Sequence, residues 1–213
     1  MARTKLKRLQ KVKEQPNVFT FDDYKRDLEK QNFFKTKRVF SLEIGCGHGD
    51  YSVEFGKKFP QRNFVGIDLK AARIFNGAVK ALELKLNNVA FIIGRAERIV
   101  EILPTNSVEE IYIPFPDPHI RRKSEKRRLI SPFYLNIYKR LLTESGEIHL
   151  KTDNENFFDY ALETISGFGC KILYSSRHVY DSDTMKTNFG IVTTYERFYI
   201  KQGKRIMYLR FKF

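Results

Sequence analysis

The sequence contains few cysteines, no tryptophan and no long apolar segment. Cys46 and Cys170 are its only cysteines among 213 residues, and they form no CxxC pair, which excludes a disulfide scaffold and a zinc finger. No stretch reaches the ~20 apolar residues of a membrane helix, so we expect no membrane association. The basic N-terminus lacks the apolar segment of a secretory signal. We therefore expect a cytoplasmic protein without a bound metal.

Positive charge is in excess and is concentrated in three segments. The net charge is +14, from 39 Lys and Arg residues against 25 Asp and Glu residues. Residues 1–14, 119–128 and 197–213 carry +5, +5 and +6, so the rest of the chain has a net charge of −2. Solvated charge that keeps the protein soluble is one explanation. Because the charge is clustered, we favour the other explanation, binding to nucleic-acid phosphates that weakens with salt.

The middle of the chain alternates short apolar segments with longer amphipathic ones. The patterns predict strands over residues 38–44, 63–68, 89–94, 108–115 and 146–151. Helices are predicted over residues 50–59, 70–86, 132–142 and 154–165, and a short helix that ends at residue 103 is predicted after the strand over residues 89–94. This alternation implies right-handed crossovers and a parallel sheet with helices on both faces.

The C-terminal part follows a different pattern. Residues 170–180 and 205–213 suit two further strands, and Thr193 with Glu196 matches a capping box that opens a short helix. We expect the last strand to be antiparallel, since no long crossover helix precedes it. The predicted fold is an α/β doubly wound, mostly parallel seven-stranded sheet. A basic N-terminal extension (residues 1–37) would precede a single domain (residues 38–213).

A glycine-rich loop, residues 43–49 (EIGCGHG), follows the first predicted strand. A dinucleotide fingerprint requires G-x-G-x-x-G/A; Gly45 and Gly47 fit, but the third position is Asp50, whose carboxylate would repel a pyrophosphate. S-adenosylmethionine has no phosphate and carries a sulfonium cation, so the loop favours this cofactor. Asp68 ends the next strand, where its oxygens can accept both ribose hydroxyls. The alternative is a turn that only joins a strand to a helix.

Several motifs in order give a resemblance to a known family. Residues 116–119 (PDPH) lead into a basic segment that ends at residues 126–128 (KRR). Together with the glycine loop, residues 151–153 (KTD) and Thr193-x-x-Glu196, they make residues 39–213 resemble the single-chain bacterial tRNA (guanine-N7)-methyltransferases, which are Rossmann-like class I enzymes. The resemblance implies methyl transfer from S-adenosylmethionine to N7 of the variable-loop guanine (position 46) of tRNA. S-adenosylhomocysteine would be the product, and no obligate protein partner is implied.

The resemblance also implies roles for individual residues. The residues expected at the cofactor are Glu43, Gly45, Gly47, Asp68, Arg95 and Asp117. Those expected at the substrate are Arg121, Asp153, Thr193, Thr194, Tyr195 and Glu196. The charge of the basic segment assigns Lys123, Lys126, Arg127 and Arg128 to RNA phosphates. Two positions depart from the family pattern: His119 replaces a tryptophan, and Arg95 replaces an Asn or Asp.

The expected reaction does not need a strong base. N7 of guanine has a lone pair and no proton, so catalysis depends on proximity and alignment. A carboxylate can accept hydrogen bonds from N1–H and the exocyclic amine of guanine. Asp117 and Asp153 are the two candidates, and we expect Asp117 to be the catalytic residue. One alternative is an RNA-binding protein that has lost turnover, favoured by His119 and Arg95. Another is a methyltransferase that acts on a different RNA or on a small molecule.

Overall fold

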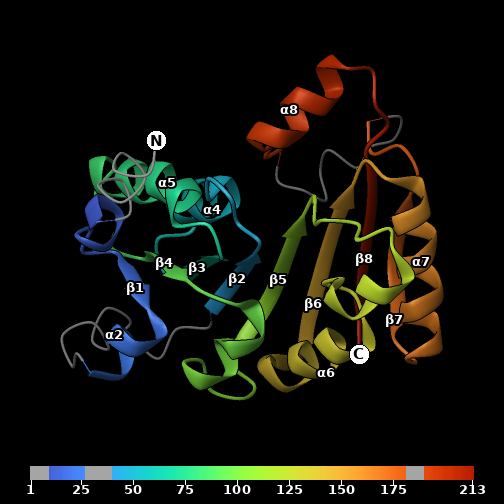
Figure 1. The fold of residues 1–213 in the computed structure, drawn as a ribbon, viewed down its shortest axis with the longest axis horizontal. Helices are drawn as coiled ribbons and strands as arrows, with labels where there is room; N and C mark the ends of the chain where they lie inside the picture. The colour runs from blue at the N-terminus through green and yellow to red at the C-terminus, as the bar shows by residue number, and fades with distance from the viewer. Residues whose placement is uncertain (1–9, 27–39, 181–189) are drawn as a thin grey trace. The chain divides into compact units, whose positions relative to one another are not determined.

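The computed structural model describes residues 10–26, 40–180 and 190–213 (Figure 1). It divides into two compact units, residues Met1–Pro104 (unit 1) and Thr105–Phe213 (unit 2). The expected boundary between residues 37 and 38 remains a prediction. Residues 1–9 and 27–37 of the expected extension, and residues 38–39 of the first predicted strand, lie outside the described residues.

Unit 1 consists of a parallel sheet and the helices packed on it. Its described strands are β1 (Val18–Thr20), β2 (Phe40–Ile44), β3 (Asn63–Asp68) and β4 (Val89–Ile93), in the order β1-β4-β3-β2. Its helices are α2 (Phe21–Arg26), α4 (Asp50–Lys58), α5 (Ala71–Glu83) and the 3₁₀ helix η2 (Ala96–Glu101). Helices α4 and α5 pack on β3 and β4 (Figure 1). The strands are almost entirely buried, as expected for a parallel sheet covered by helices.

Strand β1 was not predicted from the sequence. Its three residues pair in parallel with β4, with Val18 opposite Phe91. The segment before it is also held, because the buried side chain of Asn17 donates to the carbonyl of Ala78 in α5 at 3.0 Å. The described part of the chain therefore has eight strands rather than the predicted seven. A three-residue strand has no detectable period, and its partner lies far along the chain.

Unit 2 combines parallel and antiparallel strands. They are β5 (Val108–Pro114), β6 (Leu142–Thr152), β7 (Lys171–Ser176) and β8 (Met207–Lys212), in the order β5-β6-β8-β7. Strand β5 is parallel to β6, whereas β8 is antiparallel to both β6 and β7, which confirms the predicted antiparallel last strand. The helices are the 3₁₀ helix η3 (Arg122–Arg127), α6 (Pro132–Leu141), α7 (Glu155–Gly167) and α8 (Thr194–Lys201). Helix α8 begins with the predicted capping box.

A histidine lies inside the core of unit 2. The ring of His149 stacks on Tyr112, with centroids 4.6 Å apart, and its Nδ1 lies 2.8 Å from the hydroxyl of Tyr208. Burial lowers the pKa of His149 to about 3, so the ring is neutral at physiological pH. We therefore assign His149 to packing rather than to chemistry.

Candidate functional site

The glycine loop of unit 1 has a backbone that only glycine adopts without strain. Gly45, Gly47 and Gly49 have φ angles of 68°, 54° and 69°, in the left-handed region. The loop is fixed to the neighbouring strand, because the amides of Gly45 and Cys46 donate to the carbonyl of Ile67 at 2.9 and 3.0 Å. The sequence pattern therefore forms a rigid turn at the carboxyl end of β2, where ligands bind in open α/β sheets.

Asp68, at the end of β3, is hydrogen-bonded to this loop through its carboxylate. One carboxylate oxygen accepts from the amide of Gly47 at 3.0 Å, and the other accepts from the amide of Lys70 at 2.7 Å. A carboxylate has about four acceptor positions, so each oxygen retains a lone pair for a ligand hydroxyl. The side chain is partly exposed, which leaves that capacity accessible.

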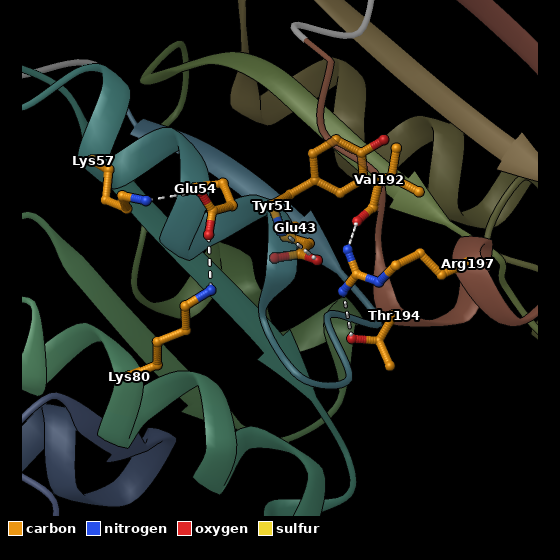
Figure 2. Close-up of polar contacts among 8 residues, drawn as sticks. All are labelled: Glu43, Tyr51, Glu54, Lys57, Lys80, Val192, Thr194 and Arg197. Carbon is orange, nitrogen blue, oxygen red and sulfur yellow. Dashed lines mark hydrogen bonds and ion pairs between the residues drawn. The ribbon is translucent and has the colours of Figure 1, made fainter.

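Glu43, in contrast, is buried and engaged by its own chain. One carboxylate oxygen accepts from the amide and the hydroxyl of Ser52 at 2.8 and 2.7 Å. The other accepts from the amide of Tyr51 at 3.4 Å, and Figure 2 shows Glu43 beside Tyr51. The side chain is 2% exposed. Burial raises the pKa of Glu43 to about 8, although the donors on Ser52 and Tyr51 act to lower it. Glu43 thus holds the first turn of α4 instead of presenting its carboxylate to solvent.

Replacing Glu43 by glutamine is expected to change how stability depends on pH. Between pH 4.5 and about 8, folded Glu43 keeps a proton that the unfolded chain has lost, so the unfolding free energy of the wild type falls as pH rises. Glu43→Gln lacks this titration, so its unfolding free energy rises relative to that of the wild type over that range. The rise is ~1.4 kcal/mol for each unit by which the folded pKa exceeds the unfolded pKa. Urea unfolding at several pH values measures the difference.

Glu54→Gln provides a control of opposite sign for that experiment. Hydrogen bonds from Lys80 and Lys57 lower the pKa of Glu54, so its contribution is present above pH 4.5 and is lost as pH falls below that value. Parallel pH profiles for wild type and Glu43→Gln between pH 4.5 and 8 would contradict the assignment of Glu43.

The helices that flank the glycine loop are joined to each other. Glu54 of α4 accepts from Lys57 at 3.2 Å and from Lys80 of α5 at 2.8 Å (Figure 2). At Gly77 of α5, an added Cβ would lie 2.3 Å from the carbonyl oxygen of His48 in the loop. Only glycine allows this close approach, so α5 supports the loop directly.

Arg95 follows β4 and lies at the surface of unit 1. Its side chain is 70% exposed, and its guanidinium lies 3.5 Å from a carboxylate oxygen of Glu97. A guanidinium donates hydrogen bonds and accepts none, so it cannot take hydrogens from an adenine amino group. The predicted contact of Arg95 with the cofactor would require its guanidinium to donate to nitrogens of the adenine ring, and it remains a prediction.

In unit 2, Asp117 lies on a short segment between two strained residues. Phe115 and His119 have φ angles of 51° and 41°, which are rare for bulky side chains. One oxygen of Asp117 accepts from the amide of His119 at 2.9 Å and lies 3.6 Å from its Nδ1. The Asp117 side chain is nevertheless 73% exposed. The chain thus holds this carboxylate at the surface, where it can meet a ligand.

The start of the Asp117 segment is attached to β6 and α8. The amide of Phe115 donates to the carbonyl of Lys151 at 2.8 Å. Its ring packs on Tyr199 of α8, with centroids 5.3 Å apart. Backbone strain of this kind persists where the surroundings over-determine it, and it is common at functional sites.

A buried ion pair joins β6 to α8. Lys151 Nζ lies 2.5 Å from a carboxylate oxygen of Glu196, and their side chains are 4% and 0% exposed. The same oxygen accepts from the hydroxyl of Tyr180 at 2.6 Å, while the other accepts from the amide of Thr193 at 3.3 Å. Burial lowers the pKa of Lys151, and Glu196 opposes that shift. Glu196 therefore has its acceptors engaged inside unit 2.

The first turn of α8 presents its other residues outward. Thr194 and Tyr195 are exposed, whereas Thr193 is buried as the helix cap. Arg197 braces this turn by donating to the carbonyl of Val192 at 2.7 Å and to the hydroxyl of Thr194 at 3.4 Å (Figure 2). Of the predicted substrate residues on α8, Thr194 and Tyr195 are thus accessible to a ligand.

Asp153, just beyond β6, is paired near the same helix. A carboxylate oxygen accepts from Lys204 at 2.5 Å, and the Asp153 side chain is 17% exposed. The ammonium of Lys204 also lies 4.4 Å from the ring centroid of Tyr199. A guanine bound by Asp153 would therefore meet a carboxylate that already has a cationic partner.

The basic segment is not uniform. Four of its cationic side chains are exposed: Arg121, Lys123, Lys126 and Arg127. Arg128 is partly buried and donates to the carbonyls of Pro118 and His119. The sequence assigned Arg128 to RNA with its neighbours, because a list of charges does not show what each guanidinium contacts.

Among the described residues there is neither a cluster of metal ligands nor a membrane-spanning helix. No group of three or more His, Cys, Asp or Glu side chains within residues 10–26, 40–180 and 190–213 is placed to hold a metal ion. None of the helices found in those ranges is both long and apolar enough to cross a membrane.

The chain is similar in sequence to known methyltransferases. Residues 37–209 match a family described as putative methyltransferases. The chain is 46% identical to the tRNA (guanine-N(7)-)-methyltransferase of Christiangramia forsetii, covering 85% of this chain and 82% of that one. It is 37% identical to the enzyme of the same name from Cytophaga hutchinsonii, covering 100% and 99%.

Solved structures show the same fold at low sequence identity. The 16S rRNA methyltransferase KamB superposes with a TM-score of 0.63 at 15% identity, covering 87% of this chain and 93% of that one. A SAM-dependent methyltransferase from Aquifex aeolicus superposes with a TM-score of 0.55 at 15% identity, covering 95% and 97%. These likenesses confirm the predicted Rossmann-like class I methyltransferase fold.

Proposed function

The chain belongs to the tRNA (guanine-N7)-methyltransferase family, and we propose that it transfers a methyl group from S-adenosylmethionine to N7 of the variable-loop guanine of tRNA. The observation that carries this proposal is the surface-held carboxylate of Asp117, on a segment that matches the motif of the family. The glycine loop of unit 1 and the exposed basic residues of unit 2 supply the two further functions that the reaction requires.

The residues of unit 1 fit this cofactor. The left-handed turns at Gly45 and Gly47 let a ligand approach the backbone closely, and Asp68 retains acceptor capacity for ribose hydroxyls. Asp50 begins α4, where its carboxylate disfavours a phosphate and suits a cation. When bound, S-adenosylmethionine supplies an electrophilic methyl group on a positively charged sulfur. Glu43 would act as a positioning residue, since it fixes the first turn of α4 beneath the loop.

The contribution of Asp117 is to bind and orient the base. Guanine N7 attacks with its own lone pair, so the chain does not have to remove a proton from it. The free acceptor positions of Asp117 can take N1–H and the exocyclic amine of guanine, two donors that lie side by side. Alignment of this kind contributes up to ~7–11 kcal/mol in favourable cases.

The tRNA backbone would be held by cations of the basic segment. Lys123, Lys126 and Arg127 are exposed in and near η3. Arginine can grip a phosphate with two hydrogen bonds, and lysine acts as a point charge. Arg121, Thr194 and Tyr195 are exposed residues that we propose contact the substrate nearer the modified base.

One experiment tests the proposed function directly. The purified protein is incubated with S-adenosylmethionine carrying a labelled methyl group and with unmodified tRNA, and the labelled nucleotide is then mapped. Label on N7 of the variable-loop guanine supports the proposal. Binding of cofactor and tRNA without methyl transfer would identify an RNA-binding protein that has lost turnover, and label on another RNA would change the substrate.

A further inference from the structure

We propose that Arg128 is a positioning residue that holds the Asp117 segment in place, rather than a phosphate contact like its neighbours. The proposal rests on the proposed function, because it concerns how Asp117 is presented to guanine. It separates Arg128 from Arg127, although the two residues are adjacent and have the same side chain.

The first observation is where the guanidinium of Arg128 donates. Its Nε lies 3.1 Å from the carbonyl oxygen of Pro118, and its Nη2 lies 3.3 Å from the carbonyl oxygen of His119. These two carbonyls directly follow Asp117 in the chain. One planar group therefore fixes two successive peptides, a geometry that the fork of arginine provides and a lysine ammonium does not.

The second observation is what lies against the face of the guanidinium. The central carbon of the Arg128 guanidinium lies 4.0 Å from the ring centroid of Tyr160 in α7, within the range of a cation–π contact. The hydroxyl of Tyr160 is buried and has no hydrogen-bond partner among the described residues. Tyr160 therefore contacts Arg128 through its ring. Arg128 thus connects the Asp117 segment to a helix.

The third observation is that this segment needs support. His119 has a φ angle of 41°, and its amide donates to Asp117, so the position of the carboxylate depends on the backbone at His119. Phe115 anchors the segment on one side through β6 and α8. Arg128 anchors it on the other side, through its bonds to the carbonyls of Pro118 and His119.

Alanine variants at the two adjacent arginines separate positioning from phosphate binding. For Arg127→Ala we expect weaker tRNA binding, a higher KM for tRNA, and a salt slope of log K lower in magnitude by ~0.7–0.9, as for one lost phosphate contact. For Arg128→Ala we expect the wild-type salt slope and a kcat lower by ~10–100-fold at saturating tRNA, because the base is misaligned. Filter binding over a salt series and steady-state kinetics measure both.

Further variants keep the test decisive if Arg128→Ala is unstable. Arg128→Lys retains the charge but loses the fork, so we expect it to lose kcat as well. Tyr160→Leu removes the ring and is expected to lower kcat, whereas Tyr160→Phe retains the ring and is expected to behave as the wild type. Thermal unfolding of each variant verifies that it is folded under the assay conditions.

A readout without turnover makes the proposal independent of catalysis. Hydrogen exchange at the amide of His119 is expected to be faster in Arg128→Ala than in the wild type or Arg127→Ala. The proposal is overturned if Arg128→Ala lowers the salt slope as Arg127→Ala does while exchange at His119 stays unchanged. If the wild type does not methylate tRNA, the proposed function fails, yet exchange and salt slope still decide what Arg128 contacts.

Discussion

Asp117→Ala is expected to reduce kcat by at least ~100-fold while leaving tRNA affinity and its salt dependence close to those of the wild type. The Asp117 side chain is 73% exposed, and among the described residues its carboxylate accepts one hydrogen bond, from the amide of His119. Its removal should therefore cost little stability. Because a carboxylate does not bind phosphate, the cations that hold the tRNA backbone are unaffected. Single-turnover methylation at saturating tRNA, with separate binding measurements, tests both parts.

Asp117→Asn is the matched control for this prediction. The amide has the same shape but presents a donor in place of one acceptor, so it opposes one of the two adjacent guanine donors. We expect Asp117→Asn to be impaired nearly as strongly as Asp117→Ala. Near-normal turnover in either variant would refute the role of Asp117, and a large loss of tRNA affinity would show that the residue supports binding instead.

Lys151→Met is expected to lower the unfolding free energy by about 3–5 kcal/mol, because it leaves the carboxylate of Glu196 buried without its cation. The Lys151 and Glu196 side chains are 4% and 0% exposed, so solvent cannot replace the lost partner. The double variant Lys151→Met/Glu196→Gln removes both charges and keeps acceptor and donor groups at the helix cap. We expect it to recover much of the loss. Urea unfolding of both variants gives the comparison.

A more exposed ion pair, between a residue after α8 and a residue after β6, provides the control. Lys204 pairs with Asp153 at the surface, with side chains 42% and 17% exposed. We expect Lys204→Met to change stability far less than Lys151→Met, because surface pairs contribute little in water. If Lys151→Met unfolds at the wild-type midpoint, or if the double variant is no more stable than the single one, the buried pair does not hold β6 to α8.

Local features of the fold were predicted correctly because local sequence produces them. The capping box at Thr193 and Glu196 is formed by residues three apart, and the structure confirms it. The predicted glycine loop is also local: the structure shows left-handed turns at Gly45 and Gly47, a conformation that glycine adopts without strain. Strand β1 was missed because three residues become a strand only when β4 offers them an edge.

For the site residues, too, the sequence predicted the local features and not the contacts with distant residues. The sequence identified Glu43 as a carboxylate at the correct end of a strand, but it did not show that Ser52 and Tyr51 engage that carboxylate inside unit 1. It also identified Glu196 as part of a cap, but it did not show that Glu196 pairs with Lys151, which lies 45 residues earlier. Contacts between distant residues leave no local pattern in a single sequence.

The sequence by itself determined the α/β class, the glycine loop, the carboxylate after the second predicted strand and the placement of positive charge. Each of these features depends on residue type and short spacing, because these directly determine local backbone conformation and local charge. Only the tertiary structure decided which carboxylates are buried, and which of two adjacent arginines supports the Asp117 segment. Burial and hydrogen-bond partners depend on where the folded backbone brings distant carbonyls and rings, and the order of residues alone does not encode those distances locally.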